Sequence, residues 1–63
     1  MSAAQDEEYL QLVYMKMGAI KDDPTMDANR RFAAHLNAII SSHAAVYGAT
    51  ETAKKFAAVK LPT

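Results

Sequence analysis

The sequence predicts an all-α fold, in which two antiparallel helices form a hairpin and a short third helix follows. Apolar residues recur at intervals of three and four over residues 3–21 and 24–47, which is the spacing of one face of an α-helix. One short break, Asp-Asp-Pro-Thr at residues 22–25, separates the two stretches, and the chain contains only two glycines and two prolines. A connection this short places consecutive helices side by side and antiparallel.

The first helix is expected over residues 3–21. Ser2 can cap its amino-terminal end, where acidic side chains also complement the helix dipole. Its main apolar stripe consists of Tyr9, Leu10, Val13, Tyr14, Met17 and Ile20. A second patch lies behind this stripe and consists of Glu8, Leu12, Met15 and Ala19. Because a monomeric pair of helices would leave this patch exposed, we expect it to contact another protein.

The second helix is expected over residues 24–47, with Asp23 as its N-cap and Pro24 at its first position. Proline fits the first turn of a helix, and it disfavours helical conformation in the residue before it. One face of this helix carries the large residues Phe32, Leu36, Ile39, Ile40, His43, Val46 and Tyr47. The other face carries the small residues Ala34, Ala38, Ser41 and Ala45, which would let another helix approach closely. We expect the large residues of both helices, together with Phe56, to form the core or the seam between copies.

His43 lies at the centre of the large face. In this position we expect a neutral core histidine that is hydrogen-bonded to the hydroxyl of Tyr9 or Tyr14. A pH-responsive contact at a subunit interface is the alternative, because histidine changes charge near neutrality. His35 lies at the edge of the same face, where partial exposure is expected.

A short third helix is expected over residues 51–60. Gly48 can end the second helix, Thr50 can cap the third, and Pro62 can close it. The alternative is one continuous helix through Gly48, at the cost of about 1 kcal/mol for an internal glycine.

The 63 residues form a single domain, and a chain this short buries only about 60% of the surface that it exposes when unfolded. Small scaffolds usually add disulfides, a metal or a second subunit. The chain has no cysteine, and its two histidines, His35 and His43, lack the i, i+4 spacing of a helical metal site. We therefore expect no cofactor and no metal, and we expect a homo-oligomer.

These observations predict a protein that is not an enzyme. Ser41, Ser42 and His43 are consecutive, so they point to different sides of a helix and cannot form a nucleophile and base pair. The leading hypothesis is a protein–protein interaction module, a small self-associating regulator, inhibitor or assembly subunit that docks on a larger protein. Its expected interface comprises Glu8, Leu12, Met15, Ala19, Ala34, Ala38, Ser41 and Ala45.

The alternative hypothesis is a nucleic-acid-binding protein. Its expected polyanion contacts are Arg30, Arg31, Lys54, Lys55 and Lys60. The formal net charge of zero weighs against it, although residues 1–23 carry a charge of −3 and residues 24–63 a charge of +3. We expect no secretory signal and no membrane span, and a location in the cytoplasm or within a larger assembly.

Overall fold

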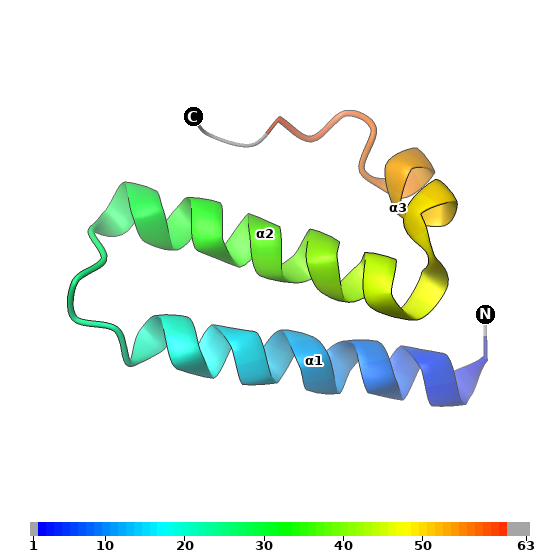
Figure 1. The fold of residues 1–63 in the computed structure, drawn as a ribbon, viewed down its shortest axis with the longest axis horizontal. Helices are drawn as coiled ribbons and strands as arrows, with labels where there is room; N and C mark the ends of the chain where they lie inside the picture. The colour runs from blue at the N-terminus through cyan, green and yellow to red at the C-terminus, as the bar shows by residue number, and fades with distance from the viewer. Residues whose placement is uncertain (1, 61–63) are drawn as a thin grey trace.

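The computed structural model describes residues 2–60 and contains three helices, α1 (Ala3–Lys21), α2 (Ala28–Tyr47) and α3 (Ala49–Lys55). Helices α1 and α2 lie side by side and antiparallel, while α3 follows the carboxyl end of α2 (Figure 1). Residues 56–60 turn back along α2, on the side away from α1 (Figure 1). The described residues contain no strand, which confirms the all-α prediction.

The expected bounds of the first helix are confirmed. Ser2 Oγ accepts a hydrogen bond from the Gln5 N–H at 3.1 Å, and the Gln5 side chain accepts one from the Ser2 N–H at 3.3 Å. This reciprocal capping box satisfies two backbone donors that the first turn would otherwise leave unpaired. At the other end, the Asp22 N–H donates to the Gly18 carbonyl at 3.1 Å and closes the last turn.

The start of α2 differs from the prediction. The N-cap is Asp27, whose Oδ1 accepts from the Arg30 N–H at 2.8 Å. Asp23 instead holds a turn, accepting from the N–H and the hydroxyl of Thr25 at 2.9 and 2.6 Å. These bonds, led by the hydroxyl contact, lower the pKa of Asp23. The prediction that Asp23 caps α2 and that Pro24 opens it is therefore wrong, because the carboxylate is used in the Asx-type turn.

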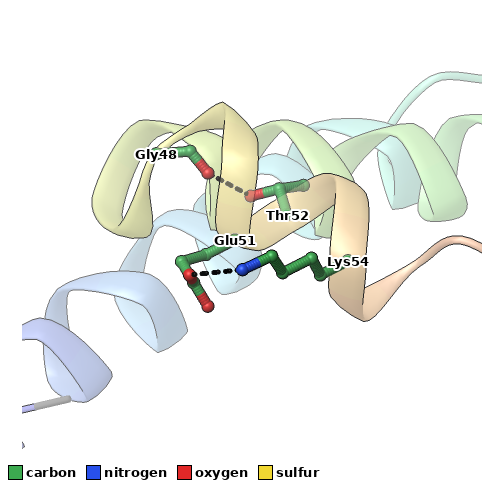
Figure 2. Close-up of polar contacts among 4 residues, drawn as sticks. All are labelled: Gly48, Glu51, Thr52 and Lys54. Atoms are coloured by element: carbon green, nitrogen blue, oxygen red, sulfur yellow. Dashed lines mark hydrogen bonds and ion pairs between the residues drawn. The ribbon is translucent and has the colours of Figure 1, made fainter.

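Gly48 separates α2 from α3, so the alternative of one continuous helix is wrong. Its φ of +92° lies outside the range that other residues adopt readily. The Thr52 hydroxyl donates to the Gly48 carbonyl at 2.8 Å, and the Thr52 N–H donates to the same oxygen at 3.1 Å (Figure 2). Helix α3 thus begins at Ala49 without the expected Thr50 cap.

Helix α3 is also shorter than expected, since it ends at Lys55 and a turn follows over residues 56–58. Lys54 and Glu51 form an exposed ion pair at 3.8 Å on its surface (Figure 2). Exposed pairs of this kind add at most about 1 kcal/mol. The expected role of Pro62 lies outside the described residues.

The core is thin because the chain forms one layer, with Cα extents of 36 × 24 × 11 Å. Only three apolar side chains among the described residues are buried, namely Val13, Ile20 and Ala38. The chain exposes 4645 Å², against roughly 4,000 Å² for a compact folded chain of 6.9 kDa.

Several large apolar side chains remain exposed on this layer. The exposed fractions are 50% for Leu10, 70% for Tyr14, 64% for Met15, 58% for Phe32 and 41% for Val59. We expected Leu10, Tyr14 and Phe32 either in the core or in a seam between copies. They are not core residues of a single chain, so the first of these two expectations is wrong. A seam between copies remains a prediction for them.

Candidate protein-interaction surface

An open groove runs between α1 and α2, and four residues of the expected interface meet in it. The groove is lined by Lys16, Ala19, Ile20, Ala34, Asn37, Ala38 and Ser41. The two expected patches, one on each helix, therefore adjoin on one side of the hairpin. Sequence periodicity placed each patch on its own helix but could not place them beside each other.

Helix spacing extends this surface along α1. Glu8, Leu12 and Lys16 are four residues apart, as are Met15 and Ala19, so they continue the wall of the groove toward the amino end of α1. Glu8 and Met15 are exposed and Leu12 is half-buried. We call the groove residues together with Glu8, Leu12 and Met15 the groove face.

The small residues of α2 differ in their accessibility. Ala38 is only 5% exposed, so the chain itself covers it, which corrects its expected place at an interface with another protein. Ala34 is half-buried, while Ser41 and Ala45 are exposed. On the small face of α2, Ala38 therefore packs within the chain, whereas Ser41 and Ala45 remain accessible.

Lys16 is a member of the groove face that sequence reasoning missed. Its ammonium donates to Ser41 Oγ at 2.9 Å and so bridges the two helices across the groove. Ser41 Oγ in turn donates to the Ala38 carbonyl at 3.4 Å. The signal in the sequence was its position four residues after Leu12 and eight after Glu8, on the patch that periodicity had already identified.

The charges of the groove face have no ion-pair partner among the residues that the structure describes. Among residues 2–60 the one ion pair is Lys54 with Glu51 on α3. Glu8 is exposed, and Lys16 uses one of its three ammonium donors on Ser41. Both groups are therefore available to a partner of complementary charge.

A second cluster lies where α1 begins, α2 ends and α3 packs. The ring of His43 contacts the rings of Tyr9, Tyr47 and Phe56, with centroid distances of 5.5, 4.5 and 5.3 Å. His43 is 2% exposed, which confirms its expected burial and rules out a contact at a subunit interface.

The hydrogen-bond partner of His43 is Thr52, not a tyrosine as expected. Nδ1 of His43 lies 2.7 Å from the Thr52 hydroxyl. Because that hydroxyl donates to the Gly48 carbonyl, it accepts from an Nδ1–H of His43, so Nδ1 carries a proton. Nε2 is buried without a partner among the described residues. Tyr9 supplies its ring instead, and Tyr14 is exposed.

A pocket of about 380 Å³ adjoins this cluster and is lined by Gln5, His43, Tyr47, Glu51 and Lys55. Two of its polar groups hold α1 against α2. The Gln5 amide donates to the Val46 carbonyl at 3.4 Å, and the Tyr47 hydroxyl donates to the Asp6 carboxylate. The bond to Asp6, followed by burial, raises the pKa of Tyr47 to about 12. The pocket is thus part of the contact between the helices.

The residues expected to contact a polyanion do not form one stripe. Arg30 and Arg31 lie at the start of α2, whereas Lys54 and Lys55 follow its end, and 20 helical residues rise about 30 Å. The Arg31 guanidinium is moreover engaged, donating to the carbonyls of Ile20 and Asp23 at 2.8 and 2.7 Å. Lys60 lies on the returning segment beyond α3.

Comparisons with family models, with curated proteins and with solved structures found no match for this chain. Within residues 2–60, no helix combines the length and the apolar character that a bilayer crossing requires. No group of three or more histidine, cysteine or carboxylate residues suited to a metal ion occurs in that same part of the chain. Function is therefore inferred from the groove face and from the layer that carries it.

Proposed function

We propose that this chain is a non-catalytic protein–protein interaction module, a small helical protein that associates with itself and docks on a larger protein as a regulator or an assembly subunit. The observation that carries the proposal is the exposure of large apolar side chains on a single layer of helices. Folded domains bury their apolar faces between at least two packed layers. One copy of this chain supplies one such layer, and a partner would supply the other.

We assign that role to the groove face, which contains Met15, one of the five exposed large apolar side chains among the described residues. It combines a half-buried leucine, a methionine that is 64% exposed and small residues from both helices. Methionine is flexible and polarizable and is used often at binding surfaces. Apolar patches of this kind mark interaction sites more often than they occur by chance on monomers.

The proposal is tested with the variant Leu12→Ser/Met15→Gln. Because Met15 is exposed and Leu12 is half-buried, we expect α-helical content to remain close to that of the wild type. Association should be weakened, since the variant removes the two largest accessible apolar side chains of the groove face. Circular dichroism measures the helicity, and sedimentation equilibrium at several concentrations measures the mass in solution.

The matched control is Gln11→Ser, which changes an exposed residue of α1 outside the groove face. It should leave both measurements unchanged. A wild-type chain with the mass of a single copy at all concentrations would contradict self-association. Loss of helicity in step with loss of association would show that Leu12 and Met15 stabilise the single chain rather than an interface.

Docking on a larger protein is tested by affinity capture from the source cell, with the wild type and the double variant as paired baits. A protein captured by the wild type and lost with the variant would support docking through the groove face. A protein retained equally by both baits would move the docking site to another surface.

A further inference from the structure

We propose that the groove face is covered by a second copy of the same chain, packed face to face so that the two α1 helices run antiparallel. In this arrangement the Glu8 carboxylate of each copy pairs with the Lys16 ammonium of the other. The inference rests on the proposed function and adds to it the identity of one partner and the way in which it packs.

The size of the layer suits such a dimer. Its broad side measures 36 Å by 24 Å between Cα extremes and includes α3 beside the hairpin, so this outline is the upper limit for a face-to-face contact, and a standard interface takes roughly 800 Å² from each partner. Two stacked hairpins would form a four-helix arrangement around one shared core. The second copy would thereby supply the layer that one chain lacks.

The charge pattern of α1 selects the antiparallel orientation. Glu8 and Lys16 lie four residues before and four residues after Leu12, on one stripe of the helix. A two-fold axis near Leu12 brings Glu8 of each copy level with Lys16 of the other, so two opposite-charge pairs form. A parallel arrangement in register would instead place Glu8 beside Glu8 and Lys16 beside Lys16, and like charges disfavour that contact.

Lys16 is already held in position for this pairing. Its bond to Ser41 Oγ at 2.9 Å keeps the side chain across the groove. A side chain that is ordered before association loses less conformational entropy when the partner binds. Two of the three ammonium donors remain for Glu8 of the second copy, and Glu8 has no ion pair within the described residues.

The small residues of α2 permit the two layers to approach. Ala34, Ser41 and Ala45 carry little bulk on the side of α2 that borders the groove. When the α1 helices pair about Leu12, the same two-fold axis brings the α2 helices together near Ser41 and Ala45, because Ser41 lies beside Lys16 and Val46 beside Gln5. Self-complementarity of this kind, in which one surface meets its own copy, is the defining property of an isologous dimer.

The experiment is a charge exchange across the two-fold axis. Glu8→Lys places lysine opposite lysine in the homodimer, and Lys16→Glu places glutamate opposite glutamate. Because each dimer contains the pair twice, each single variant should weaken homodimerisation by about 10- to 100-fold in Kd. An equimolar mixture of the two single variants restores both opposite-charge pairs, so it should form a heterodimer with close to wild-type affinity.

The matched controls are Glu7→Lys and Lys21→Glu, which make the same charge changes at exposed positions of α1 outside the groove face. Their dimers should resemble the wild type in sedimentation equilibrium, and circular dichroism should show α1 intact in every variant. The double variant Glu8→Lys/Lys16→Glu should dimerise with itself, because its two changes restore the pairs in exchanged order.

Two results would overturn the inference, and they differ in what they imply. If the wild type associates but neither single variant weakens it, the antiparallel pairing is wrong while self-association stands. If the wild type remains a single chain at all concentrations, this inference and the self-association in the proposed function both fail. Rescue in the mixture of single variants supports the pairing specifically, since a merely destabilised helix would not recover on mixing.

Discussion

The two regions of this hairpin differ in whether a third element covers them. Where α1 begins and α2 ends, α3 adds the hydroxyl of Thr52 and the turn after α3 adds the ring of Phe56, and His43 is 2% exposed among three aromatic rings. Along the middle of the same two helices no other helix of residues 2–60 packs, and Tyr14 and Met15 are 70% and 64% exposed. Two helices alone therefore bury few of their apolar residues, whereas the short α3 and the turn after it cover His43 locally.

We call the end of the hairpin that α3 packs against the covered end, and the middle of α1 and α2 the open region. The covered end buries polar side chains, whereas the described residues of the open region do not. Three polar side chains of the described residues are buried at or near the covered end, those of Ser42, His43 and Thr52. Ser42 Oγ and His43 Nε2 have no hydrogen-bond partner among residues 2–60. A buried unpaired polar group costs about 1–3 kcal/mol. The aromatic contacts of His43 and its hydrogen bond with Thr52 therefore have to offset that cost at this end of the hairpin.

The substitution His43→Ala is expected to change the free energy of unfolding the most. It removes the ring that the aromatic cluster surrounds, and the cavity should lower the free energy of unfolding by about 2–4 kcal/mol. The control Met15→Ala, in the open region, should change that free energy by less than about 0.5 kcal/mol in the single chain. Urea unfolding followed by circular dichroism, at concentrations below association, measures both. Equal effects would show that the two regions do not differ in stability.

A smaller effect is expected from Thr52→Val, which keeps the shape of the side chain and removes its hydroxyl. The Nδ1–H of His43 then loses its acceptor, and the predicted loss is about 1–3 kcal/mol. The control is Thr50→Val, which changes an exposed residue of the same helix and carries the same difference in helix propensity. Hydrogen exchange should show faster opening of α3 in the first variant only. Equal protection in both would mean that the hydroxyl does not hold α3.

The helices differ in how far the sequence alone predicts them. The bounds of α1 follow from local signals, namely the Ser2 cap and the periodic stripe. The start of α2 does not, because Asp23 and Asp27 both suit an N-cap. In the structure, the Thr25 hydroxyl donates to the Asp23 carboxylate, and the Arg31 guanidinium donates to the Asp23 carbonyl. Asp27 is therefore the N-cap.

The same limit applies to the candidate surface. Periodicity assigned Leu12 and Met15 to a patch on α1, but the meeting of that patch with Ala34 depends on how each helix is rotated about its own axis. Long-range contacts settle that rotation, for example from Gln5 to Val46. The partner of His43 was missed for a related reason, since the position of α3 depends on tertiary packing rather than on its own sequence.

The smallest effect concerns Tyr47, which joins the covered end to α1 through the Asp6 carboxylate at the solvent-exposed surface. That bond raises the pKa of Tyr47 to about 12, against about 10 for an unfolded tyrosine. The folded chain thus disfavours the phenolate, so the stabilisation is complete below about pH 10 and is lost as the pH rises toward 12. Titration of tyrosine absorbance should show a component that ionises near pH 12. Tyr47→Phe should remove this late component, whereas Tyr14→Phe, at an exposed position, should preserve it. If no late component near pH 12 is found, the contact of Tyr47 with Asp6 does not hold the covered end closed in solution.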